Sequence, residues 1–226
     1  MRCAARRCAG RRRRRRARGG RWRRPRRRAR AEEGRGLVRG SSTPVRGAVL
    51  LYGLLAVGAV TWVLADRGTI DLWRHPEPLW RFPFAAGLAG GLVVGVVFGR
   101  IVAWLSRWAV RRTRWGAGLH EEFHALLGPL PDSDILLLAF LSAAAEECFF
   151  RGALQPTVGL VAASLMFGGM HLPVNKRFIV WTIEATVLGF ALGALFWAGG
   201  QLAAPVAAHF TINYENLHFV RRYRPA

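Results

Sequence analysis

The chain has 226 residues, 52% of them hydrophobic, with 34 Lys+Arg against 13 Asp+Glu and a formal net charge of +21. The charge is unevenly distributed, because residues 1–36 hold 18 arginines and two acids while the rest of the chain is only mildly basic. This pattern argues against a basic nucleic-acid-binding globule, in which the charge spreads over the folded surface. The three cysteines are too few and too badly spaced for a disulfide framework or a zinc ribbon.

The N-terminal segment 1–46 is predicted to be a disordered, Arg-rich cytoplasmic tail. Its low-complexity composition buries too little apolar surface to fold by itself. We expect it to contact anionic lipid head groups, and nucleic acid is the disfavoured alternative. A start assigned too early is a third interpretation, since the Arg/Ala/Gly bias is typical of a GC-rich reading frame.

Six apolar segments follow, each long enough to cross a hydrocarbon core that requires about 20 helical residues. They are expected at about 47–65, 83–105, 135–151, 155–172, 178–198 and 202–220. Segment 107–133 mixes basic, aromatic and apolar residues at helical spacing, which is typical of an amphipathic helix at the membrane surface. The sequence therefore predicts an all-α, multi-pass transmembrane helix bundle, with two spans and the interfacial helix in 47–134 and the other spans in 135–226. The last four spans are expected to be separated by breaks at Arg151-Gly152, at Pro173 with Lys176-Arg177, and at Gly199-Gly200.

The lysines and arginines of the loops indicate the orientation of the bundle. With the N-terminus inside, the inside segments hold Arg107, Arg111, Arg112, Arg114, Lys176, Arg177, Arg221, Arg222 and Arg224. The outside loop between the first two spans balances three arginines with three acids, and the turn at Gly199-Gly200 is uncharged. We therefore expect both termini to be cytoplasmic, in the plasma membrane of a bacterial cell.

Ionisable and amide side chains within the predicted spans need an explanation, because they are costly in hydrocarbon unless they are paired or functional. Glu147 and Arg151 are one helical turn apart and can pair, which leaves the neighbouring Glu146 free to face another group. The next two constellations, Phe167 with His171 and His209 with Asn213, also share a helix face at a spacing of four residues. Glu184 and Glu215 are further acids in the spans and stay outside the predicted site.

These three constellations, taken in order, resemble the motifs of the CPBP family. This is the family of CAAX proteases and bacteriocin-processing enzymes, also called ABI, which are glutamic-type intramembrane endopeptidases. The matching motifs are E-E-x-x-x-R at 146–151, F-x-x-x-H at 167–171 and H-x-x-x-N at 209–213, within a resemblance over about 135–217.

The resemblance implies roles for seven residues. Glu146 is the implied general base that activates a water molecule, and His171 would hold the same water. His209 and Asn213 would donate hydrogen bonds to the oxyanion of the tetrahedral intermediate. The implied supports of the site are Glu147, Arg151 and Phe167. We expect no cofactor, although a divalent metal at the Glu/His site stays open.

Other interpretations of single residues remain. His120, Glu121 and His124 form an H-E-x-x-H pattern, the helical zinc motif of metalloproteases, in a charged segment without a clear third ligand. Cys148 lies inside the first motif and is a candidate thiol nucleophile, or a small buried filler at a position that the motif leaves free.

The predicted function is an intramembrane endopeptidase that acts on a membrane-associated protein or peptide by Glu-activated water, with membrane lipids as further partners. The alternatives are a non-catalytic scaffold or bacteriocin self-immunity protein, and a small proton-coupled transporter. Counting helical turns puts Glu146 and His209 at roughly 17 and 20 Å from the inner edge of their spans, and His171 shallower. Either the fourth span begins later than residue 155, or these groups do not share one site.

Overall fold

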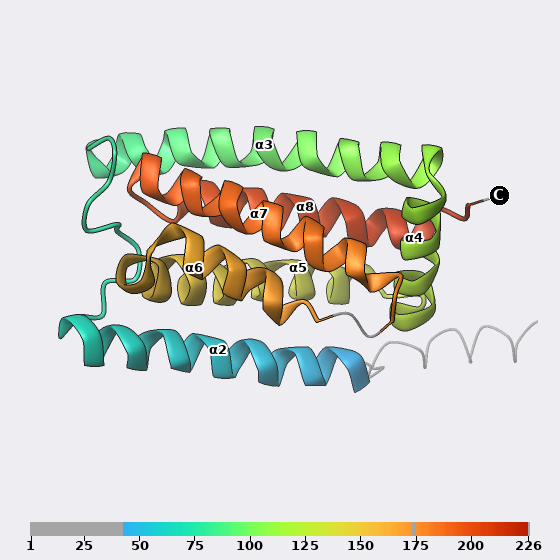
Figure 1. Ribbon diagram of the computed structural model, residues 1–226, viewed down its shortest axis with the longest axis horizontal. Helices are drawn as coiled ribbons and strands as arrows, with labels where there is room; N and C mark the ends of the chain where they lie inside the picture. The colour runs from blue at the N-terminus through green and yellow to red at the C-terminus, as the bar shows by residue number, and fades with distance from the viewer. Residues whose placement is uncertain (1–42, 173–174, 226) are drawn as a thin grey trace, which may run out of the picture. The chain divides into compact units, whose positions relative to one another are not determined.

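The fold of residues 43–172 and 175–225, which a computed structural model describes, is a bundle of helices that run in both directions along one axis (Figure 1). The helices are α2 (Thr43–Arg67), α3 (Phe84–Arg112), α4 (Arg114–Leu127), α5 (Asp132–Glu147), the π-helix η1 (Cys148–Leu154), α6 (Gln155–Met170), α7 (Phe178–Gly199) and α8 (Ala203–Arg222). The predicted all-α class is confirmed. The predicted tail lies outside the described residues except for its last four, which form the first turn of α2.

Three helices are long and apolar enough to cross a membrane by length and composition: α2, α3 and α7. They are the first, second and fifth of the six expected spans. The other expected spans differ from these three. Helix α5 continues through η1 into α6 as far as Gly159, α6 itself has 16 residues, and α8, with 20, carries several polar side chains. Helices α5 and α6 also expose large apolar side chains. Together with the three long apolar helices, these surfaces indicate a membrane protein with several passes.

Small residues bring α3 and α8 into close contact. Gly91, Gly95 and Gly99 recur every four residues on α3 and face backbone atoms of Ala204 and Ala208 on α8. A Cβ atom on Gly95 would meet the Ala204 carbonyl oxygen at 2.3 Å, so the two backbones touch at a distance that only glycine permits. This contact joins the second predicted span to the helix that carries His209 and Asn213.

The segment predicted as one amphipathic helix over 107–133 is divided by the structure. Its first six residues extend α3 to Arg112, and the chain then turns at Thr113 into α4. The Thr113 hydroxyl accepts a hydrogen bond from the Gly116 amide at 3.0 Å, as an N-cap residue does. Helix α4 ends at Gly128, whose φ of +62° is the left-handed backbone conformation that favours glycine.

The predicted break at Arg151-Gly152 is wrong. The chain continues through η1 into α6 without leaving the helical region, and the reversal occurs at Gly159, with φ +83° and ψ 164°. Gly159 is 13 residues after Glu146 and 12 residues before His171. The chain therefore runs from Glu146 to the reversal and returns to His171 over nearly equal lengths. This later reversal removes the difference in depth that the sequence predicted for His171.

The two ends of the bundle differ in composition. At one end, α4 contacts the α6–α7 turn through Arg177 and Glu122, whose Nη1 and Oε1 atoms are 3.0 Å apart, and the end of α8 contacts the start of α5 through Arg221 and Asp132. At the other end, the loop 68–83 packs on the α7–α8 turn, and the His75 amide donates to the Gly200 carbonyl at 3.0 Å. We call these the α4 end and the loop end; they appear at the right and left of Figure 1.

Candidate active site

The two neighbouring glutamates at the end of α5 have different partners. Glu147 is fully buried, and its Oε2 lies 3.3 Å from Nε of Arg151, the ion pair that the spacing of four predicts. Its other oxygen accepts a hydrogen bond at 2.7 Å from Nδ1 of His209. Glu147 therefore joins the first motif on α5 to the third motif on α8.

Arg151 is held by an aromatic ring as well as by its ion pair. Its guanidinium carbon lies 4.2 Å from the centroid of the Phe167 ring, a cation–π distance, and its Nη2 donates to the Gly189 carbonyl of α7 at 3.2 Å. The Phe167 ring also contacts the His171 ring, with centroids 4.8 Å apart. Phe167 thus links the charge pair to the second motif.

The Glu146 carboxylate faces two imidazoles. Its Oε2 is 3.9 Å from Nε2 of His171 and 4.0 Å from Nε2 of His209. These separations are too long for direct hydrogen bonds. Glu146 Oε2 is a buried atom that has no hydrogen-bond partner among the residues that the structure describes.

The orientation of His171 is fixed by its own helix end. Its Nδ1 lies 2.7 Å from the Phe167 carbonyl oxygen, which only accepts, so Nδ1 carries a proton and donates. In the neutral ring Nε2 is then an acceptor directed at Glu146. The Trp181 ring of α7 packs edge-on against the imidazole, with centroids 4.8 Å apart, and holds it in place.

Asn213 is positioned by a residue that the motifs did not indicate. Its Nδ2 donates to the Ser142 hydroxyl at 2.8 Å, and Ser142 donates in turn to the Ala139 carbonyl. Ser142 precedes Glu146 by one helical turn, so the spacing of four is the signal that could have identified it. The Tyr52 side chain of α2 lies beside Glu146 and Ser142, and no local pattern predicts this contact between distant helices.

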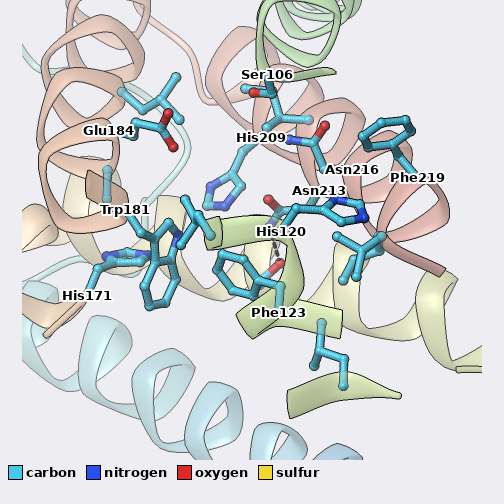
Figure 2. Close-up of a pocket in the computed structure, with 18 of the residues that line it drawn as sticks. Ser106, His120, Phe123, His171, Trp181, Glu184, His209, Asn213, Asn216 and Phe219 are labelled. Carbon is cyan, nitrogen blue, oxygen red and sulfur yellow. Dashed lines mark hydrogen bonds between the residues drawn. The ribbon is translucent and has the colours of Figure 1, made fainter. Parts of the chain in front are cut away.

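A cavity of about 380 Å³ opens onto these groups, and α4 lies across it (Figure 2). Its lining is predominantly apolar. Figure 2 shows His171, Trp181 and Glu184 on the α6–α7 side, and His209, Asn213 and Asn216 along α8. The structure thus brings all seven predicted site residues into one region, with Glu146, Phe167, His171, His209 and Asn213 lining the cavity and Glu147 and Arg151 buried behind it.

The residues of the H-E-x-x-H pattern lie on α4, and His120 also lines the cavity. His120 Nε2 is 3.0 Å from the Tyr223 carbonyl and His124 Nδ1 is 3.1 Å from the Val220 carbonyl, so both imidazoles are directed at the end of α8. Glu121 lies 3.6 Å from Arg177 at the surface. No group of three or more His, Cys, Asp or Glu residues suited to a metal ion occurs within 43–172 and 175–225.

Cys148 is turned towards α2. It packs against the apolar cluster of Ala59, Val63 and Ala153, beside Leu72. It does not line the cavity, so its position fits the interpretation as a small filler.

Part of the chain is similar to known proteins. Residues 131–214 match the sequence profile of the family described as type II CAAX prenyl endopeptidase Rce1-like. The chain is also 39% identical over 79 residues to the uncharacterized protein YpbD of Bacillus subtilis (strain 168). That alignment covers 35% of this chain and spans 41% of the length of YpbD. No solved structure matches the chain.

The matched segment 131–214 contains all seven residues of the three motifs, and the structure gathers the same seven around one cavity. The Rce1-like endopeptidases are a family of proteases, which agrees with the family that the three motifs resemble. The resemblance to the CPBP family of intramembrane endopeptidases that the three motifs predict is therefore confirmed for this chain over residues 131–214.

Proposed function

We propose that the protein is an intramembrane endopeptidase that hydrolyses a peptide bond of a membrane-associated protein or peptide with a water molecule activated by Glu146. The observation that carries this proposal is the buried Oε2 atom of Glu146, which faces His171 and His209 at 3.9 and 4.0 Å and has no direct hydrogen-bond partner in the described part of the chain. A purely structural carboxylate at this depth is expected to be fully paired.

The geometry suits a water shared between Glu146 and His171. Two acceptors 3.9 Å apart are too far for a direct bond, but both can accept hydrogen bonds from one water. A water that donates both protons in this way keeps its lone pairs free for attack on a carbonyl carbon. Transfer of one proton to Glu146 during the attack makes it the general base.

We propose that His209 and Asn213 stabilise the oxyanion that the attack creates. His209 can donate from Nε2 only as an imidazolium, because Nδ1 already donates to Glu147. The Glu147 carboxylate at 2.7 Å stabilises that cation. Asn213 uses one Nδ2 proton for Ser142 and retains the second for the substrate. Each such donor typically lowers the activation barrier by about 3–4 kcal/mol.

Glu147 and Arg151 are positioning residues in this mechanism. Arg151 neutralises one of the two adjacent glutamates and fixes it against His209, so that Glu146 is the glutamate directed at the cavity. The apolar cavity lining excludes bulk water and strengthens the electrostatic interactions within it. Cys148 has no role in this scheme.

We propose a bacterial plasma membrane, with both termini cytoplasmic and lipids around the bundle. The Arg-rich tail would bind anionic head groups. We also propose that the reaction needs no metal, and expect cleavage to persist in the presence of a strong chelator; loss on chelation, with recovery on adding back Zn²⁺, would contradict this.

The test compares wild type with Glu146→Gln by terminal-peptide proteomics of the membrane fraction. Gln keeps the shape of the side chain but cannot accept the proton, so the Glu146-dependent products should vanish at equal protein level. Glu77→Gln, in an exposed loop at the loop end, is the matched control and should leave the products in place. Identical peptide profiles in wild type and Glu146→Gln would favour the non-catalytic scaffold instead.

A further inference from the structure

A second carboxylate lines the cavity, and the mechanism above does not use it. Glu184 is the only charged residue of α7, and it shares a helix face with Trp181, Ala185 and Leu188, which also line the cavity. Figure 2 shows it on the α7 side, above Trp181. No ion pair or hydrogen bond joins its side chain to another residue of 43–172 or 175–225.

No lysine or arginine of the described cavity lining neutralises Glu184, and the imidazolium that we propose at His209 is bonded to Glu147. Among the described residues that line the cavity, the acids are Glu146 and Glu184, and there is no lysine or arginine. The buried Arg151 behind the cavity forms its ion pair with Glu147 and stacks on the Phe167 ring. A carboxylate in such a place is costly unless a cation joins it.

Glu184 lies about one helical turn from Trp181, the residue that contacts His171. Trp181 contacts the His171 ring at 4.8 Å, and Glu184 follows Trp181 by three residues on the same face, about one turn or 5 Å along α7. An extended peptide advances about 3.3 Å per residue. A substrate held at Glu146 and His171 would therefore pass Glu184 within about three residues of the bond that is cleaved.

We propose that Glu184 is a specificity residue that binds the ammonium or guanidinium group of a Lys or Arg side chain lying within about three residues of the scissile bond. This proposal rests on the proposed function, because it assumes a peptide in the cavity. The long apolar stem of Lys or Arg suits the leucines of α7, and the charged end pairs with the carboxylate. The ion pair with Glu184 forms only when a substrate enters, so an apolar peptide that lacks the cation cannot form it.

Binding is tested without hydrolysis, in the Glu146→Gln background and in nanodiscs. The probes are fluorescent nonapeptides of leucine and alanine in which one lysine occupies each position in turn, with a norleucine series as the uncharged counterpart. We expect the best lysine peptide to bind at least about tenfold more tightly than its norleucine partner, the order of a close charge pair out of water. Adding Glu184→Gln should remove that preference, and Glu184→Asp should retain part of it.

Two results would overturn the subsite. The first is equal binding of the lysine and norleucine peptides with Glu184 in place, which would mean that a proton and not a substrate cation neutralises the carboxylate. The second is a lysine preference that survives Glu184→Gln, which would place the cation elsewhere. Glu77→Gln is the matched control, since it removes one exposed carboxylate away from the cavity and should leave the preference intact.

Cleavage of the same peptides by protein with Glu146 intact separates this proposal from the proposed function. Glu146-dependent cleavage of lysine and norleucine peptides at equal rates would leave the protease and reject the subsite. A Glu184-dependent binding preference without cleavage of any peptide would leave the subsite and reject the protease.

Discussion

Glu146 and Glu147 are adjacent in sequence, but their contacts predict opposite effects of mutation on stability. Glu147 neutralises the fully buried Arg151 and accepts from His209, whereas Glu146 Oε2 lacks a direct hydrogen bond among the described residues. We expect Glu147→Gln to destabilise the protein by about 3–5 kcal/mol, because it leaves a buried guanidinium without its counter-ion. Glu146→Gln replaces a buried carboxylate whose Oε2 has no hydrogen bond among the described residues, and should leave the stability equal or higher.

The measurement is thermal unfolding of both variants in the same detergent, with wild type as reference. The predicted order of Tm is Glu147→Gln below wild type, and Glu146→Gln at or above it. Equal losses of Tm in the two variants would show that Glu146 also holds helices together, and would favour the scaffold interpretation.

Spacing along single helices predicted two contacts of the site, whereas contacts between helices were predicted only where the family resemblance implied them. Glu147–Arg151 and Phe167–His171 follow from a spacing of four residues, and both are in contact. The bond from His209 to Glu147 joins positions 62 residues apart, and nothing in local spacing specifies it. The contact of Tyr52 with Glu146 was missed for the same reason, because Tyr52 belongs to a helix outside the matched motifs.

At the scale of the elements, the glycine stripe on α3 determines how closely α8 approaches. Gly95→Ala puts a Cβ atom within 2.3 Å of the Ala204 carbonyl oxygen, so the two helices must move apart. We expect a destabilisation of about 1–3 kcal/mol. Activity should fall as well, because α8 carries His209 and Asn213.

The matched control for this prediction is Gly90→Ala on the same helix. A Cβ atom there meets nothing within 4 Å, and alanine favours a helix, so the expected effect is zero or a gain of up to about 1 kcal/mol. The readouts are Tm in detergent and the rate of peptide cleavage. If Gly95→Ala and Gly90→Ala behave alike, close contact of α3 with α8 does not determine stability.

The limits of α2 and α7 were predictable to within a few residues because each is a continuous apolar run. The reversal between α5 and α6 was not, because Arg151-Gly152 has the composition of a break while η1 continues helically through it. Gly152 has a different function there: a Cβ atom would lie 2.5 Å from the Leu72 carbonyl, so the glycine admits the loop 68–83. A glycine needed for close approach and one needed for a turn look the same in a sequence.

At the scale of the whole bundle, the basic residues gather at the α4 end. Arg177 pairs there with Glu121 and Glu122, and Arg221 pairs with Asp132. The loop end has a balanced loop and the uncharged turn at Gly199-Gly200. Because lysine and arginine are retained on the cytoplasmic side of a membrane, we predict that the α4 end faces the cytoplasm.

Two neutral, exposed positions test this orientation without changing any charge. Pro76→Cys marks the loop end and Ala125→Cys marks α4, each in a background of Cys3→Ser, Cys8→Ser and Cys148→Ala. In intact bacterial cells, a membrane-impermeant maleimide should label position 76 and spare position 125, and permeabilised cells should label both. Labelling of position 125 alone in intact cells would reverse the orientation. The cavity that α4 covers would then be reached from outside the cell. The same labelling result therefore shows on which side of the membrane the substrates approach the site.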